Sequence, residues 1–154
     1  METTNFSIDC SRVAEIEIKY VRQEISPVKI VNSRLAYQLF RQNWDQGNLD
    51  FIEELKVAYL TSGQRVLAIH SLYKGGIDAV HVDLRPIFAA ALKLCATSII
   101  LAHNHPSANA KPSIQDVNLT NKIRQAGDLL NIPLNDHIIV TRDGYYSFLD
   151  EGLI

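Results

Sequence analysis

The sequence predicts a mixed α/β fold, in which one sheet carries helices on its faces. Two strand-like runs at 53–60 and 65–73, joined by a short turn, predict a β-hairpin. A continuous apolar run at 97–103, rich in β-branched residues, is typical of a central strand buried on both faces. After a proline-containing loop, apolar residues from about 114 to 130 recur at helical spacing.

The N-terminal part of the chain divides at about residue 30. Residues 1–12 are polar and without pattern, which predicts an arm, and the alternation of apolar and charged residues over 14–21 predicts a half-buried strand. This strand can pair with the edge of a second copy of the chain, so a homo-oligomer is one expectation. The chain from 31 to 154 is expected to form a single globular unit, because its length suffices for one buried core.

Caps and turns place the elements that follow. A helix is expected to begin at Asn32 or Ser33, either of which can cap it. Gly63 is expected to supply the turn of the hairpin. A short strand is then expected at 79–83, followed by a helix at 84–96 with a proline in its first turn, where proline is tolerated.

The C-terminal part continues the alternation of helices and strands. The helix from about 114 to 130 is expected to turn four apolar residues inward: Val117, Ile123, Leu129 and Leu130. A strand, an Asp-Gly turn and a second strand follow it. Cys95 lies in an apolar run and is expected to be a small core residue. It forms no Cys-x-x-Cys pair with Cys10, so neither a disulfide framework nor a thiolate zinc site is indicated.

Composition places the chain among ordinary globular proteins. Hydrophobic residues make up 47% of the chain, charged residues 21%, and the net charge is −2. Because no basic block is present, the sequence lacks the electrostatic footprint of non-specific nucleic-acid binding. The first residues show no apolar signal sequence, and the apolar runs are too short to span a bilayer. We therefore expect a cytoplasmic protein without a membrane partner.

The strongest functional pattern is His-Asn-His-Pro at 103–106, followed by Asp116. Residues two apart on a strand project from the same side, so His103 and His105 can reach one point beyond the carboxyl end of the strand 97–103. Asp116 falls in the first turn of the next helix and faces back toward that strand end. Two histidines and one carboxylate are the ligands of a typical catalytic zinc site, which leaves a fourth position for water.

A zinc site of this kind also needs a general base beside the water. Glu53 and Glu54 stand at the mouth of the first hairpin strand, and their spacing does not choose between them. A different interpretation of Ser113 and Asp116 is that they form a capping box at the helix start. The two interpretations are compatible, because one carboxylate can both cap a helix and hold a metal.

Two further interpretations of the histidines carry less weight. The letters His-Asn-His match the name of the HNH nucleases, but the residues of that motif are dispersed over a longer stretch. His137 begins the strand after the helix, so it can approach the site from a neighbouring strand. A packing role is the more frequent one for such a histidine, and support of a metal ligand is the alternative.

Taken together, these residues resemble a known motif. His-x-His-Pro, with Asp116 following and Ser113 three residues before it, resembles the JAMM motif of the MPN/JAB-domain metalloproteases. The longer stretch from about Glu53 to Tyr146 resembles the JAB domain of the RadC branch. The resemblance implies a cytidine-deaminase-like α/β/α sandwich, with a mixed central sheet and helices on both faces.

The resemblance also implies a role for each side chain. The ligands of Zn²⁺ would be His103, His105 and Asp116. Ser113 would donate a hydrogen bond to the oxyanion of a tetrahedral intermediate. Glu53 would be the general base, with the neighbouring glutamate as the fallback. The reaction would be hydrolysis of an amide or isopeptide bond in a peptide substrate, which is the activity of a zinc metalloprotease.

Two departures from the RadC pattern bear on function. Ala-Asn-Ala-Lys at 108–111 stands where RadC-type sequences usually have glycine, so the loop is less free to take unusual backbone angles. Residues 1–52 show no helix-hairpin-helix segment, which longer RadC proteins carry, and this weakens an inherited role in binding DNA. The alternative function is a non-catalytic or DNA-associated module related to DNA repair, and a metal-dependent nuclease is a third hypothesis.

Overall fold

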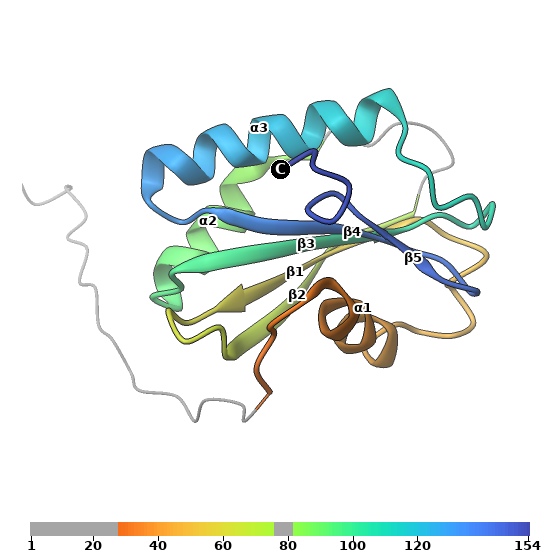
Figure 1. The fold of residues 1–154 in the computed structure, drawn as a ribbon, viewed down its shortest axis with the longest axis horizontal. Coiled ribbons are helices and arrows are strands. Elements are labelled where there is room, and N and C mark those ends of the chain that lie inside the picture. Colours follow the sequence, from red (N-terminus) through yellow and green to blue (C-terminus); the bar gives the residue numbers. More distant parts are fainter. Residues whose placement is uncertain (1–27, 76–81) are drawn as a thin grey trace, which may run out of the picture.

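The computed structural model describes residues 28–75 and 82–154 and has three layers (Figure 1). Five strands form one sheet in the order β2-β1-β3-β4-β5. They are β1 (Glu54–Leu60), β2 (Val66–Lys74), β3 (Ser98–Asn104), β4 (Leu134–Val140) and β5 (Tyr145–Ser147). One face of the sheet is covered by α1 (Ser33–Gln42), and the other by α2 (Leu84–Lys93) and α3 (Ile114–Leu130). A mixed sheet with helices on both faces confirms the predicted fold class.

Strand β3 lies in the middle of the sheet and decides where a site can form. It runs antiparallel to β1, with His103 opposite Leu55, and parallel to β4, with His103 opposite Ile139. All seven residues of β3 are buried, which confirms that this strand is buried on both faces, as expected. All seven residues of β1 are buried as well. Because β3 and β4 are parallel, their carboxyl ends meet at the same edge of the sheet.

Alternate residues of the central strands supply two hydrophobic cores. The core toward α1 includes Phe40, Leu49, Ala58, Ile100 and Ala102. The core toward α2 and α3 includes Val57, Ile87, Ile99, Leu101 and Ile123. This alternation assigns a face to the end of β3: His103 continues the side of α2 and α3, and Asn104 the side of α1.

The cap of α1 agrees with the prediction from the sequence, and the turn between β1 and β2 agrees only in part. Asn32 caps α1 by accepting a hydrogen bond from the Leu35 amide at 2.9 Å. The hairpin of β1 and β2 is present, but Gln64 and not Gly63 takes the left-handed conformation, with φ of 60°. The Gln64 amide donates to the Thr61 carbonyl at 2.8 Å and closes the turn. Gly63 thus lies in the turn without supplying its unusual backbone angle.

Two expectations about burial are wrong. Leu129 and Leu130 are 83% and 40% exposed, because the inner face of α3 follows a different helical row: Asp116, Thr120, Ile123 and Gly127. Cys95 is exposed and has φ of 51° just after α2, so it is a residue of the turn and not of the core.

The arm expected at 1–12, the strand expected at 14–21 and most of the strand expected at 79–83 lie outside the described residues. Within residues 28–75 and 82–154, none of the helices combines the length and the apolar character that crossing a bilayer requires.

At Gly127, α3 lies close to the backbone of the chain before β4. A β-carbon here would lie 2.5 Å from the carbonyl oxygen of Ile132, a backbone atom that cannot rotate away. Alanine normally stabilises a helix interior relative to glycine. Here the methyl group would push α3 from the sheet, so we expect Gly127→Ala to lower the free energy of unfolding by about 2 kcal/mol, measured by urea denaturation.

Gly144→Ala is the matched control, because a β-carbon at that position would meet nothing within 4 Å. Its free energy of unfolding should stay within about 0.5 kcal/mol of the wild-type value. A Gly127→Ala protein as stable as this control would show that the contact between α3 and the chain before β4 yields easily.

Candidate metal centre

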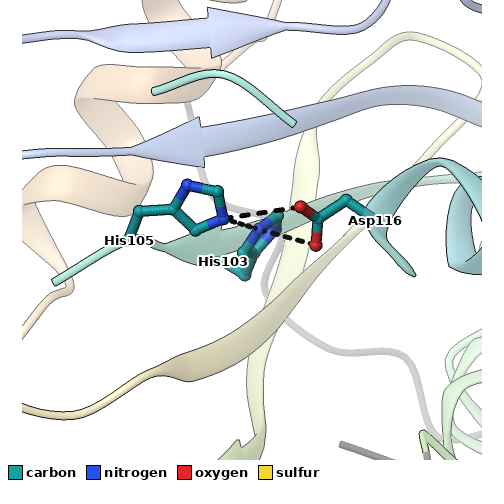
Figure 2. Close-up of side chains that lie close together, drawn as sticks. All are labelled: His103, His105 and Asp116. Atoms are coloured by element: carbon teal, nitrogen blue, oxygen red, sulfur yellow. Dashed lines mark hydrogen bonds and ion pairs between the residues drawn. The ribbon is translucent and has the colours of Figure 1, made fainter. Parts of the chain in front are cut away.

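Three side chains converge beyond the carboxyl end of β3 (Figure 2). Nε2 of His103 lies 3.1 Å from Oδ1 of Asp116 and 3.0 Å from Nε2 of His105. Nε2 of His105 lies 3.5 Å from Oδ2 of Asp116. All three ligand atoms are within 4.8 Å of one another. The structure therefore brings together the two histidines and the aspartate that their spacing placed at one point.

The chain after β3 keeps both histidines on the same side. The His105 amide donates to the Val140 carbonyl at 3.1 Å, so pairing with β4 extends one residue past Asn104. Ala108 then has φ of 61°, in the left-handed region that favours glycine. The loop thus takes an unusual backbone angle with alanine, at the position where the resemblance to RadC-type sequences led us to expect glycine.

Asp116 is held in place by the start of α3. Its Oδ2 accepts hydrogen bonds from the Ser113 amide at 2.6 Å and from the Ser113 hydroxyl at 2.7 Å. The Asp116 amide donates in return to the Ser113 hydroxyl oxygen at 3.2 Å. The predicted capping box is present, and Oδ1 is left to face His103. One carboxylate therefore both caps the helix and faces the histidines.

Hydrogen bonds behind His103 fix the position of its ring proton. The Thr120 hydroxyl lies 2.6 Å from the Asp116 carbonyl oxygen and 2.6 Å from Nδ1 of His137. Because a carbonyl only accepts, the hydroxyl donates to it and accepts from Nδ1 of His137. Burial holds the pKa of His137 well below its ordinary value, so its Nε2 carries no proton. Nδ1 of His103, 2.7 Å away, therefore donates to it, which leaves Nε2 as the acceptor of the neutral His103 ring.

The loop orients the second histidine in the same way. Nδ1 of His105 lies 2.6 Å from the Asn109 carbonyl oxygen and donates to it, which leaves Nε2 of the neutral ring bare. Two bare imidazole nitrogens and a carboxylate thus face one another. Acceptors this close repel unless a cation or a proton lies between them. The group, with protons held on the far side of both rings, can hold a metal ion.

Without a metal, a proton can take the place of the cation. Partial burial disfavours the charged form of His105, but hydrogen bonds to Asp116 and to the Asn109 carbonyl outweigh it and raise the pKa of His105. Burial also disfavours the charged form of Asp116, but interactions with His103, His105 and the Ser113 hydroxyl hold the pKa of this carboxyl far below its ordinary value. The metal-free site therefore favours a protonated His105 beside an ionised Asp116.

The stability of the metal-free protein is expected to fall as the pH rises through neutrality. The pKa of His105 is raised in the folded state above its unfolded value of about 6.5. Its stabilising contribution is therefore complete below that pH of about 6.5 and is lost as the pH rises through the folded-state pKa. Thermal unfolding of EDTA-treated protein measures this, and Asp116→Asn should flatten the dependence. A wild-type stability that increases above neutrality would contradict this protonation of His105.

The two candidate bases point to opposite sides of the sheet. Glu53 lines a cavity of about 780 Å³ together with His105 and Ser113, and its charge contributes to the raised pKa of His105. Glu54 is 2% exposed and pairs instead with Lys56 at 3.5 Å and Lys74 at 3.3 Å. The structure thus places Glu53 in the cavity that His105 also lines, whereas Glu54 pairs with lysines on the other side of the sheet.

The remaining walls of this cavity are largely apolar and include Phe51, Ile52, Pro106 and Pro112. Phe51 is 76% exposed, which is unusual for so large an apolar side chain. This cavity is bordered by a candidate metal ligand, a carboxylate and apolar side chains. Binding sites for organic ligands commonly combine apolar walls with a few polar groups in this way.

Some residues of the site were not expected from the sequence. Thr120 lies four residues after Asp116, on the same helical row, and this spacing is the signal that could have pointed to it. Asn109 acts through its backbone carbonyl, for which no residue type is diagnostic. For His137, by contrast, the sequence indicated both a packing role and support of a ligand: it is fully buried between His103 and Thr120 and hydrogen-bonds to both.

Fold and site together define a class of protein: an α/β/α sandwich with a His-His-Asp group that can hold a metal ion at the end of a central strand. The profile of the RadC-like JAB domain matches residues 30–153. The match covers most of the chain, and the protein belongs to the RadC-like JAB domain family, as the motif predicted.

Similar proteins carry the name UPF0758. The one from Porphyromonas gingivalis is 40% identical over 129 residues, which cover 81% of this chain and 54% of that protein. The one from Flavobacterium johnsoniae is 44% identical over 101 residues, covering 66% of this chain and 44% of that protein. The one from Photorhabdus laumondii is 33% identical over 142 residues, covering 92% and 61%. The chain thus spans about half the length of these relatives.

Proposed function

We propose that this protein is a zinc-dependent hydrolase of amide bonds that acts on a peptide or isopeptide substrate. The observation that carries the proposal is the convergence of two imidazole nitrogens and a carboxylate at one point, with the three ligand atoms within 4.8 Å of one another. A cavity lined by Glu53 and Ser113 lies beside that point. The resemblance to JAMM-type metalloproteases supports the same reaction.

In this mechanism His103, His105 and Asp116 would hold the ion and leave one position free. Zinc at this point would supply Lewis acidity, which polarises a carbonyl group and makes a water molecule acidic near neutral pH. Glu53 would accept the proton of the attacking water and deliver it to the leaving amine. The apolar walls of the cavity would exclude bulk water and so strengthen these charge interactions.

Ser113 would have a second role besides capping α3. Its side chain is exposed and lines the cavity, while its hydroxyl donates to Asp116. Rotation of the hydroxyl toward the cavity would present it to the oxygen of a substrate carbonyl. A preorganised donor to such an oxyanion lowers a reaction barrier by about 3 kcal/mol.

Hydrolysis assays on the zinc-loaded protein test this proposal. The substrates are a fluorogenic peptide library and peptides joined through a lysine ε-amine, with His103→Ala as the inactive control. We expect cleavage by the wild type alone. Duplex DNA titrated at several salt concentrations tests the DNA-associated alternative, which predicts binding that weakens steeply with salt. Tight, salt-sensitive DNA binding without any hydrolysis would replace our proposal by that alternative.

A further inference from the structure

The residue between the two histidines faces away from the metal group. Asn104 is fully buried on the α1 side of the sheet. Its side-chain oxygen accepts from the Glu54 amide at 2.7 Å, and its nitrogen donates to the carbonyls of Leu49 at 2.6 Å and Ile52 at 2.8 Å. Ile52 and Glu54 are the chain neighbours of Glu53. Asn104 therefore fastens the backbone on both sides of Glu53.

Among side chains of this size, asparagine alone matches these three backbone groups. One amide oxygen and two amide hydrogens meet one N–H group and two carbonyl groups. An aspartate would set a carboxylate oxygen against both carbonyls, and a serine would be too short to reach all three. Either change leaves buried backbone groups without partners, which is costly. The need for asparagine at position 104 is therefore explained by these three backbone hydrogen bonds, and not by the group of His103, His105 and Asp116.

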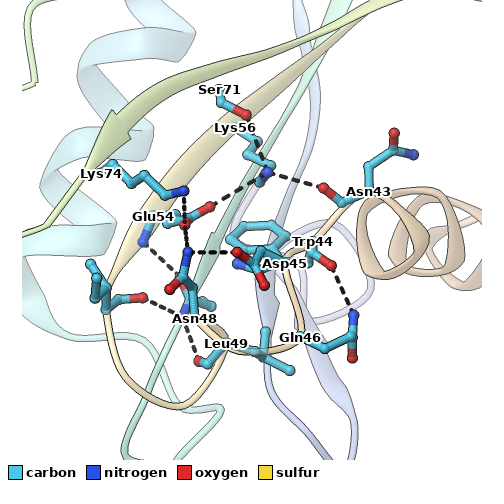
Figure 3. Close-up of polar contacts among 12 residues, drawn as sticks. Asn43, Trp44, Asp45, Gln46, Asn48, Leu49, Glu54, Lys56, Ser71 and Lys74 are labelled. Atoms are coloured by element: carbon cyan, nitrogen blue, oxygen red, sulfur yellow. Dashed lines mark hydrogen bonds and ion pairs between the residues drawn. The ribbon is translucent and has the colours of Figure 1, made fainter.

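The same segment is fastened to the α1 side at its other end (Figure 3). Nζ of the buried Lys56 donates to the Asn43 carbonyl at 3.1 Å and lies 4.9 Å from the centre of the Trp44 ring. The start of the segment 43–53 is therefore held on the α1 side of the sheet. At the end next to β1, Phe51, Ile52 and Glu53 line the cavity beside His105, and Glu53 is the only carboxylate among the described residues of that lining.

We propose that Asn104 is a positioning residue for Glu53. It holds the backbone of 52–54 against the end of β3, so that the Glu53 carboxylate faces the group formed by His103, His105 and Asp116. The end of β3 then carries two of the three candidate metal ligands on one face, and Asn104 holds the backbone of the candidate base from the other face. The inference rests on the proposed function, since it takes Glu53 as the base, and it adds a residue that touches neither metal nor substrate.

Binding of acetohydroxamate separates this role from a contribution to stability alone. A hydroxamate chelates zinc through two oxygens and donates a hydrogen bond to a carboxylate beside the metal, so its affinity reports the placement of Glu53 without turnover. We expect Asn104→Asp and Glu53→Gln each to weaken acetohydroxamate binding to zinc-loaded protein by about tenfold, measured by calorimetry. The double variant should bind no more weakly than Glu53→Gln. Asn104→Ser provides the same comparison without a buried charge.

Ser98→Ala is the matched control. Ser98 is 3% exposed at the other end of β3 and accepts a hydrogen bond from Asn135 at 3.0 Å. The variant therefore loses a buried hydrogen bond of the same strand without touching 43–53, and its acetohydroxamate affinity should equal that of the wild type. A double variant that loses a further tenfold relative to Glu53→Gln would show that Asn104 acts by another route and would overturn the proposal.

Hydrogen exchange provides a second readout that needs no metal. The Glu54 amide, which donates to Asn104, should exchange faster in Asn104→Ser than in Ser98→Ala. Unchanged exchange at this amide would also overturn the proposal. A wild-type protein that binds no zinc would instead refute the proposed function, and the exchange comparison would still decide whether Asn104 fastens the segment.

Discussion

Changing Glu53 to glutamine is expected to slow amide hydrolysis by the zinc-loaded protein by at least about a hundredfold, because glutamine cannot accept a proton from water. The substitution preserves the size of the side chain and leaves His103, His105 and Asp116 intact. Zinc content should therefore be unchanged, and kcat should fall while KM changes little. Steady-state kinetics on a peptide identified by the hydrolysis screen, together with metal analysis, measure both effects.

Glu54→Gln is the matched control, because it makes the same chemical change one residue further along the chain. Glu54 lies on the opposite side of the sheet, where Lys56, with a side chain 7% exposed, is its buried partner. Leaving that ammonium without its carboxylate is expected to lower the free energy of unfolding by about 3 kcal/mol. Below its unfolding temperature this variant should still hydrolyse the substrate. Full activity in both variants would place the base elsewhere.

Loss of a metal ligand is expected to have the second large effect. His103→Ala protein, dialysed against zinc and washed, should retain only background metal in elemental mass spectrometry, whereas the wild type should hold about one zinc per chain. Asp116→Asn separates the two roles of this residue, because asparagine can still accept from the Ser113 amide and cap α3. Its helix should persist while its zinc is lost. Full zinc occupancy in His103→Ala would mean that the ion binds elsewhere.

His137→Phe extends the same experiment to the residue behind His103. Phenylalanine keeps the stacking on Phe148, whose ring centre lies 4.6 Å from that of His137, but it cannot accept from His103. Zinc affinity, measured against a chromogenic chelator, is expected to fall by about ten- to a hundredfold, because the ligand ring is no longer held in one orientation. Wild-type affinity in this variant would leave His137 with a packing role alone.

The sequence by itself determined the fold class and brought His103, His105 and Asp116 together as a group that can hold a metal ion. A strand has a side-chain period of two, so His103 and His105 share a face whatever the strand packs against. Ser113 and Asp116 lie three residues apart at a helix start, where a capping box directs the carboxylate back along the chain. The buried character of β3 and the bounds of α3 follow from apolar patterns within each segment. All of these signals act over a few residues, and they are therefore readable without a structure.

The resemblance to the JAMM motif implied Glu53 as the base, but only the tertiary structure shows that Glu53 and not Glu54 lines the cavity, and what lies behind His103. Glu53 and Glu54 are adjacent, and the choice between them depends on the register that sets Leu55 opposite His103. The burial of Leu129 and Leu130 failed as an expectation for the same reason: the surface that covers α3 comes from distant segments. The pairing of strands far apart in the sequence is decided by the total burial and hydrogen bonding of the fold, and no local pattern encodes it.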